Sequence, residues 1–519
     1  MEKSSLQLVS EIGTILSQRT RPNKDFIIKS LRSPEPQTAK EVQATKKRED
    51  ALKPLIDAVV CGSLLHHDDK DVKLLVAICV TELFRVKAPK PPFEDMYLRD
   101  VFKLIIGLFA DLADTASPLF SKRVKVLDTM SQLKCCILML EIDCTDLVLE
   151  MFNVFFSVVR DDHNDSLINA MSSMMKDILN ESEDASQKLL EVVLRNLIKR
   201  KKDTTCASYK LAKSVIETCG QEDELNSLVC KFLSSCIYDR DAVGCGLKEY
   251  YHEIIFEVFQ CAPHMLLAII PSLIEELLAD QVDVRLKAVN LAGKLFALPN
   301  HHVAQKFHDL FVEFLKRFYD TSVDVRISAL QCAKAFYAAN PFGRESLEII
   351  TSVEGRLLDF DDRVRMHAVT AACDICCSNP MLAPVKLLAA VTERLRDKKI
   401  PVRKRVLQKL METYREYCKK CCDRSMSTSD HFEEIPCKIL MLCYDKECKE
   451  FRSQSMELVL ADNLFPDDLS VKERTNHWIH MFSLFSSFHE KALNTILIQK
   501  RRLQNEMKNY LAIRKKLKV

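Results

Sequence analysis

A Val-Arg dipeptide that recurs about every 40 residues is the feature that most constrains the fold of this 519-residue chain. Its arginines stand at successive steps of 41, 39 and 38 residues, at Arg285, Arg326, Arg365 and Arg403. Each dipeptide opens a stretch whose apolar residues recur three and four positions apart, which is the spacing of one helix face. Another apolar stretch of the same kind precedes it. A period of this length predicts helical hairpins stacked side by side into a solenoid.

The residues beside each dipeptide fit the start of a helix. Asp283, Asp324 and Asp362 precede the arginines closely, where a carboxylate can accept hydrogen bonds from first-turn amides and favour the positive end of the helix dipole. Pro401 suits the same first turn, because its missing N–H is not needed there. Small apolar residues four positions apart predict a face for close helix packing, at Val284 and Ala288, Val325 and Ala329, Val364 and Ala368, and Val402 and Val406.

Glycine is scarce, and this excludes several classes of fold. Only 9 of the 519 residues are Gly, so the turns that phosphate loops, hairpins and most barrels require are largely missing. All-β folds and nucleotide-binding α/β folds are therefore not expected. The longest apolar segment, near residues 265–278, is broken by Pro271 and is too short to span a membrane. The formal net charge of +2 leaves any phosphate binding to local basic patches.

The period and the Asp-Val-Arg helix starts resemble HEAT repeats. The resemblance implies an all-α, HEAT-repeat superhelical solenoid of the ARM-repeat-like superfamily, in which an acid and an Arg bridge neighbouring repeats. We divide the chain into amino-terminal helices and a linker (1–50), degenerate repeats (51–260), regular repeats (261–420) and further helical repeats (421–519). Such solenoids serve mainly as scaffolds, so the architecture alone does not specify a function.

The segment from Leu64 to Phe93 resembles a narrower group. It contains DKDVKLLVA from Asp69, ELFR from Glu82 and an Ala-Pro loop from Ala88. These motifs are similar to the amino-terminal region of the precocious-dissociation-of-sisters family of cohesin regulators. The resemblance implies a nuclear, chromosome-associated scaffold that maintains or releases sister chromatid cohesion, with roles in mitosis, meiosis and DNA repair. The implied partners are the cohesin complex, through its kleisin and HEAT-repeat subunits, and the wings-apart-like release factor. Members of the family continue through further repeats beyond this length, so we expect the 421–519 region to be truncated relative to the family.

The Ala-Pro loop is the first candidate site. Three prolines in six residues make it stiff, which lowers the ordering cost of binding a partner peptide, and the resemblance associates it with the release factor. Two residues depart from the family pattern, because Lys90 and Pro91 stand where an acid and Ala are usual. The alternative interpretation is an ordinary turn whose aromatic residue fills the core. The predicted site comprises Ala88, Pro89, Lys90, Pro91, Pro92 and Phe93.

A basic strip is the second candidate site. Between Arg394 and Lys409 the sequence has eight basic residues and one acid, Asp397, so several cations can converge on a phosphate group. A solvated charged face is the alternative. Few aromatic residues are interleaved, which disfavours stacking on single strands. The backbone of duplex DNA fits better, as does an inositol polyphosphate, a ligand that the resemblance also implies. The predicted residues are Arg394, Arg396, Lys398, Lys399, Arg403, Lys404 and Arg405.

No catalytic or metal motif is convincing. The sequence has no phosphate loop, nucleophile elbow or paired carboxylates, and we expect neither an enzyme nor a bound metal. A cysteine-rich stretch has one pair at zinc spacing, but no second close pair follows, and the residues weighed are Cys418, Cys421, Cys422, His431 and Cys437. The competing class is a transport or coat adaptor solenoid that binds cargo peptides in similar grooves.

Overall fold

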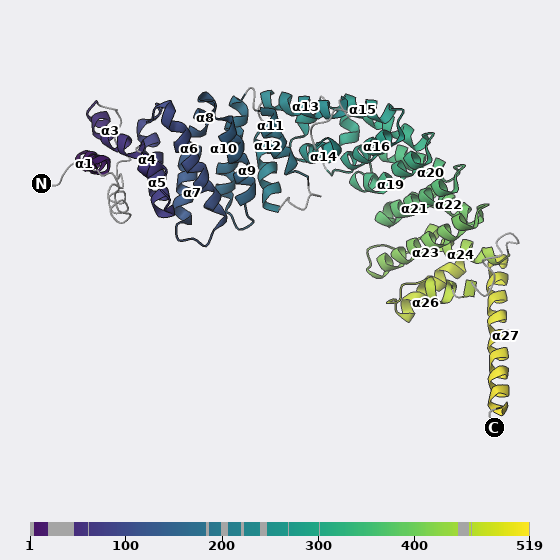
Figure 1. Cartoon of the computed structure of the whole chain (residues 1–519). Helices are drawn as coiled ribbons and strands as arrows, with labels where there is room; N and C mark the ends of the chain where they lie inside the picture. Colours follow the sequence, from purple (N-terminus) through teal and green to yellow (C-terminus); the bar gives the residue numbers. More distant parts are fainter. Residues whose placement is uncertain are drawn as a thin grey trace. The chain divides into compact units, whose positions relative to one another are not determined.

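The computed structural model describes residues 5–18, 46–60, 62–182, 186–198, 206–219, 223–238, 247–267, 269–299, 301–444, 456–457 and 459–517. These residues form α-helices joined by short turns and 3₁₀ segments, without any strand in these ranges (Figure 1). The all-α solenoid prediction is therefore confirmed. The chain divides into two compact units, residues 1–269 and 270–519.

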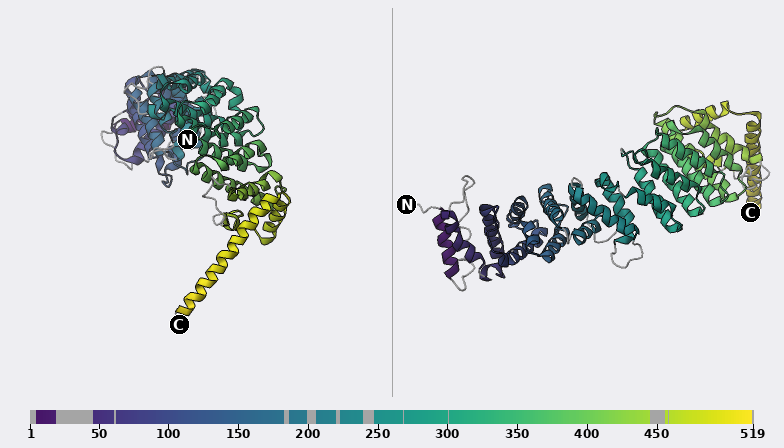
Figure 2. Two further views of the ribbon diagram at one scale, coloured as in Figure 1. Left: turned by 90° about the vertical axis from the view of Figure 1, so that its right-hand side faces the viewer. Right: turned by 90° about the horizontal axis from the view of Figure 1, so that it is seen from above.

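The first unit is a stack of antiparallel helices in two layers (Figures 1 and 2). One layer contains α5, α7, α10, α12 and α14 in contact with one another in that order, and the other contains α6, α9, α11 and α13. The helices are α1 (Ser5–Gln18), α3 (Lys46–Val60), α4 (Gly62–Leu65), α5 (Lys70–Lys87), α6 (Asp95–Phe109), α7 (Phe120–Gln132), α8 (Leu138–Glu141), α9 (Thr145–Val158), α10 (Asp165–Glu181), α11 (Ser186–Arg195), α12 (Cys206–Cys219), α13 (Asp223–Tyr238) and α14 (Tyr251–Cys261).

The second unit contains the regular repeats. Helices α15, α18, α20 and α22 form one layer, and α16, α19, α21 and α23 form the other. The helices are α15 (Ile270–Leu278), α16 (Val282–Phe296), α17 (Val303–Lys306), α18 (His308–Lys316), α19 (Val323–Ala339), α20 (Arg344–Arg356), α21 (Asp362–Ser378), α22 (Val385–Glu393), α23 (Ile400–Cys422), α24 (Asp430–Met441), α26 (Val471–Ser483) and α27 (Ser487–Leu517). Figure 1 shows α27 extending beyond α24 and α26.

The second layer of this unit is built on the predicted small-residue faces. Val325, Ala329, Val364 and Ala368 are fully buried between neighbouring helices. The backbones approach most closely at Gly293 of α16, where an added Cβ would overlap the Cys332 side chain of α19. Close approach of this kind gives the dense contacts that stabilise a helical interior. Among the described residues, no helix has the length and apolar character that a bilayer span requires.

Candidate functional site

Buried Arg–Asp pairs link successive repeats of the second unit. Arg285 of α16 donates to both carboxylate oxygens of Asp320, at 3.0 and 2.9 Å. Arg365 of α21 makes the same two-bond contact with Asp397, at 2.8 and 2.9 Å. Between these pairs, Arg326 of α19 reaches Asp359 at 3.0 Å. Each Arg therefore holds the turn of the repeat that follows, and we call these three pairs the ladder.

The ladder also fixes the shape of each turn inside a repeat. The guanidinium of Arg365 donates to the carbonyl oxygens of Asp359 and Phe360, in its own turn, at 2.8 and 3.2 Å. The Asp397 carboxylate accepts the Lys399 amide at 2.9 Å. Arg365 thus satisfies the backbone of its own turn, and its partner Asp397 satisfies the backbone of the next turn. These linked hydrogen bonds make the turns rigid platforms for the residues that they expose.

Ionisation of the ladder acids follows from these contacts. Burial alone raises the pKa of the Asp320 carboxyl, but hydrogen bonds from Arg285 and from the Ser322 amide outweigh burial, so its pKa lies below the ordinary value. The pKa of Asp397 is lowered for the same reason by Arg365 and the Lys399 amide, against burial. Both side chains are thus charged partners of buried guanidinium groups at neutral pH.

The acids of the ladder differ from those that stand out in the sequence. Asp283, Asp324 and Asp362 lie in first helical turns, as predicted, but none is a ladder partner. The side-chain cap of α21 is Asp361, which accepts the Arg363 amide. Ladder acids occur six residues before a repeat Arg, at Asp320, Asp359 and Asp397. That second spacing was available in the sequence as the signal for these residues.

The turns expose large apolar side chains between α-helices of the second unit. Phe360, which follows a ladder acid directly, is 99% exposed, and Tyr319 and Leu358 are also exposed. Tyr319 is held from one side, because the Arg356 guanidinium lies 4.2 Å from its ring centroid. Ile400 continues the exposed apolar positions into the next turn. We call Tyr319, Leu358, Phe360 and Ile400 the turn edge.

The predicted basic strip lies directly beside the turn edge, but the structure divides it. Lys398, Lys399 and Lys404 are exposed, as is Arg396, and Arg394 is half-buried. Arg403 is only 6% exposed and donates to the Asp397 carbonyl oxygen at 2.7 Å. Arg403 occupies the repeat position of the ladder arginines, which face the interior, and it therefore presents little surface to a phosphate.

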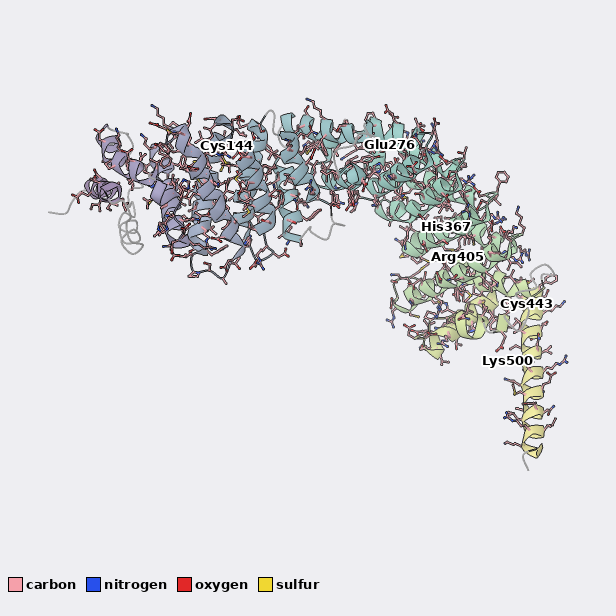
Figure 3. All side chains as sticks on the ribbon, viewed as in Figure 1. Cys144, Glu276, His367, Arg405, Cys443 and Lys500 are labelled. Atoms are coloured by element: carbon pink, nitrogen blue, oxygen red, sulfur yellow. The ribbon has the colours of Figure 1, made fainter. Side chains whose placement is uncertain are left out.

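Arg405 also faces a neighbouring helix. Its Nε donates to Thr370 Oγ1 at 3.1 Å, and it lies beside His367 of α21 (Figure 3). Burial lowers the pKa of His367, and the Arg405 charge lowers it further. Lys409 pairs with Asp374 and Glu412. The basic residues of the strip that are exposed to solvent are Arg396, Lys398, Lys399 and Lys404.

The Ala-Pro loop joins α5 to α6 and is also divided. Ala88, Pro89, Lys90 and Pro91 are exposed, and the Ala88–Pro89 peptide bond is cis. Pro92 is buried, and Phe93 is 5% exposed with its ring edge-on to Phe84 at 5.8 Å between centroids. The alternative interpretation thus describes Phe93 correctly, and the surface open to a partner is 88–91.

The cysteine-rich stretch lies beside a buried polar cluster, where the Cys437 thiol contacts the Glu433 carbonyl oxygen. In the described part of the chain, no group of three or more His, Cys, Asp or Glu side chains could hold a metal ion. His431 contacts the Ser429 hydroxyl at 2.8 Å. Nearby, the fully buried Glu433 carboxylate contacts Tyr414, Tyr417 and His477 at 2.7, 3.1 and 2.6 Å. No periodic spacing in the sequence marks this cluster, because its members come from three helices.

Stacked hairpins, a buried Arg–Asp ladder and exposed turns define the class of HEAT-repeat scaffolds. The chain belongs to the family described as sister chromatid cohesion protein PDS5, whose sequence profile matches residues 25–519. Sister chromatid cohesion protein PDS5 homolog A of Arabidopsis thaliana is 39% identical over 98% of this chain and 30% of that protein. The human PDS5 homolog A is 27% identical over 89% of this chain and 34% of its own length.

A solved structure shares the fold. It is described as the Pds5–Scc1 complex with implications for cohesin function, and its matching chain has a TM-score of 0.64 and 17% identity, over 88% of this chain and 74% of that one. The family profile and the Arabidopsis relative confirm the family assignment drawn from the Leu64 to Phe93 motifs. This chain spans about a third of the length of the curated relatives that it matches.

Proposed function

We propose that this chain is a scaffold without chemistry of its own that binds cohesin and regulates sister chromatid cohesion in the nucleus. Family membership supports the process, and the helical-repeat fold supports a binding role. The observation that carries the proposal is the turn edge, where Phe360 projects fully into solvent from a turn held by the buried Arg365 and the half-buried Arg326. An exposed aromatic residue on a rigid support loses little entropy when a partner covers it, so it is typical of a binding anchor.

The partner that we assign to the turn edge is the kleisin subunit of cohesin. The solved relative was studied as a complex with Scc1, and an extended kleisin segment can lie along successive turns of a solenoid. The exposed lysines at 398, 399 and 404 add a cationic end to this surface. They favour an acidic stretch of the kleisin, the backbone of duplex DNA or an inositol polyphosphate.

The wings-apart-like release factor is assigned to the exposed residues 88–91 of the Ala-Pro loop, and the HEAT-repeat subunit of cohesin is a further partner of the scaffold. Lys90 replaces the acid that the family usually carries in this loop, so the preferred release-factor peptide should complement a positive charge. Roles in mitosis, meiosis and DNA repair belong to the same proposal.

The test compares two exposed phenylalanines of the same unit. Phe360 lies in the turn before α21, whereas Phe342 is 81% exposed in the turn between α19 and α20, at the opposite helix ends. Purified chain is titrated with a recombinant kleisin fragment by calorimetry. We expect Phe360→Ser to weaken binding about tenfold and Phe342→Ser to leave it unchanged. Absence of kleisin binding by the wild-type chain, or equal effects of both substitutions, would contradict the proposal. Recovery of coat or nuclear-transport components instead of cohesin from cell extracts would favour the adaptor class.

A further inference from the structure

A cavity of about 400 Å³ lies among α4, α5 and α6 of the first unit. Its apolar floor is formed by Leu65, Leu104 and Leu108. Charged and polar side chains surround this floor, from the residue after α4, the first turn of α5, the middle of α6 and the 3₁₀ turn that follows α6. They are His66, Lys70, Lys73, Asp100, Lys103 and Asp111.

The two carboxylates of the cavity already have partners. Asp111 contacts Lys70 at 3.2 Å and Arg123 at 3.5 Å. Asp100 lies 3.4 Å from His66. By contrast, Lys73 and Lys103 make no ion pair or side-chain hydrogen bond with any described residue. The cavity thus has cationic groups in excess, and its two uncommitted charges come from different helices.

One glycine lines the cavity. Gly107 lies on α6 among the lining residues, and a Cβ added there would meet no atom within 4 Å. Glycine in the middle of a helix is unfavourable relative to alanine. Gly107 thus lowers the local stability of α6 but leaves space above the leucine floor. A larger side chain at position 107 would fill that space.

We propose that this cavity binds an acidic peptide segment, with a carboxylate between Lys73 and Lys103 and an adjoining apolar side chain on Leu104 and Leu108. Two ammonium groups can bind one carboxylate, because each has three N–H donors and neither is neutralised by an acidic side chain of the residues that the structure describes. The leucine floor supplies apolar area that a free inorganic anion cannot use. An Asp or Glu next to a Leu, Ile or Phe satisfies both requirements.

This inference goes beyond the proposed function, since the cavity is separate from both surfaces assigned above. The Ala-Pro loop lies at the opposite end of the α5–α6 hairpin, between Lys87 and Asp95. At 1.5 Å per residue, the 18-residue α5 separates the two sites by roughly 25 Å. The turn edge belongs to the second unit. Loss of binding at the cavity therefore leaves the kleisin test unaffected, and the reverse also holds.

The experiment selects peptides against the complete chain. A displayed library of random peptides is enriched on the wild-type protein, and the recovered peptides are synthesised for fluorescence anisotropy. We expect an excess of Asp or Glu beside an apolar residue. Their affinity should fall about tenfold in Gly107→Phe and in the double variant Lys73→Glu/Lys103→Glu.

Two controls separate the site from general effects. Gly107→Ala strengthens the helix but leaves the cavity largely open, and it should bind as the wild type does. Lys122→Glu/Lys188→Glu makes the same change of charge at exposed lysines outside the cavity, and should also bind normally. Thermal melting confirms that each variant is folded. Peptides without acidic residues, or peptides that bind Gly107→Phe normally, would overturn the proposal, as would enrichment of no peptide while inorganic phosphate binds.

Discussion

The guanidinium of Arg365 and the carboxylate of Asp397 meet in two parallel hydrogen bonds, at 2.8 and 2.9 Å, although they belong to consecutive repeats. Each side chain is 3% exposed. Arg365 also donates to the carbonyl oxygen of Asp359, so one residue connects its own turn with the next. This contact explains why the Val-Arg dipeptide, rather than the apolar face alone, is the most regular mark of the repeats.

Removing Arg365 should therefore be severe. Arg365→Ala leaves the Asp397 charge buried without its main partner, and we expect the free energy of unfolding to fall by about 3–5 kcal/mol. The matched control is Arg363→Ala on the same helix. Arg363 is exposed and its contacts to Asp324 and Asp361 are long, at 3.8 and 3.4 Å, so its loss should cost less than about 0.5 kcal/mol. Urea denaturation measures both, and similar losses for the two variants would show that the ladder is not a special source of stability.

The same pairs predict sensitivity to acid. The folded-state pKa values of Asp320 and Asp397 are lowered, since their hydrogen bonds from arginine outweigh burial. Their contribution to stability is therefore complete above the unfolded pKa of about 3.9 and is lost as the pH falls through the lower folded value. The urea midpoint should decrease steeply below about pH 4.5. Asp320→Asn/Asp397→Asn should be less stable at pH 7 and show a shallower acid decrease; an unchanged slope would exclude these two groups as its cause.

The regular repeats could be predicted from the sequence because their Val-Arg dipeptides recur at nearly the same spacing. Individual roles were harder to assign, since a one-dimensional pattern does not show which side of a helix faces the next repeat. Arg403 illustrates this point: it belongs to a run of basic residues and also to the series of repeat arginines, and the second property determines its burial. The partners of Glu433 lie on three helices without periodic spacing, so only the folded chain brings them together.

Substitutions at the two ends of the Ala-Pro loop should have different effects, on peptide binding at Lys90 and on stability at Phe93. Phe93 is buried against Phe84, and Phe93→Ala should cost about 3–5 kcal/mol. Lys90 is exposed, so Lys90→Glu should leave the melting temperature unchanged and alter affinity for a wings-apart-like peptide. Differential scanning calorimetry and anisotropy give the two readouts. A stability loss in Lys90→Glu, or unchanged peptide affinity, would remove residues 88–91 from the list of binding surfaces.

The buried carboxylate of Glu433 should be essential for the packing of α26. Glu433→Ala leaves the polar groups of Tyr414, Tyr417 and His477 without this acceptor, and each buried donor left unpaired costs about 1–3 kcal/mol. Glu434→Ala is the control, because this neighbouring side chain is exposed. We expect a large fall in the urea midpoint for the first variant and little change for the second. Equal midpoints would mean that water or repacking replaces the carboxylate.

The basic strip should bind polyanions through its exposed lysines. If Lys398, Lys399 and Lys404 contact phosphates of duplex DNA, each contributes about 0.9 to the slope of log affinity against log salt. Reversing all three to Glu should thus flatten that slope by about three. Arg403 is excluded from this set because its guanidinium is buried against the Asp397 carbonyl. An inositol polyphosphate should raise the melting temperature of the wild-type chain, since it binds the folded state selectively, and the triple variant should lose this increase. The control Lys122→Glu/Lys188→Glu should keep both properties. If the triple reversal changes neither the salt slope nor the polyphosphate-induced increase in melting temperature, the basic strip is a solvated surface and the phosphate assignment is wrong.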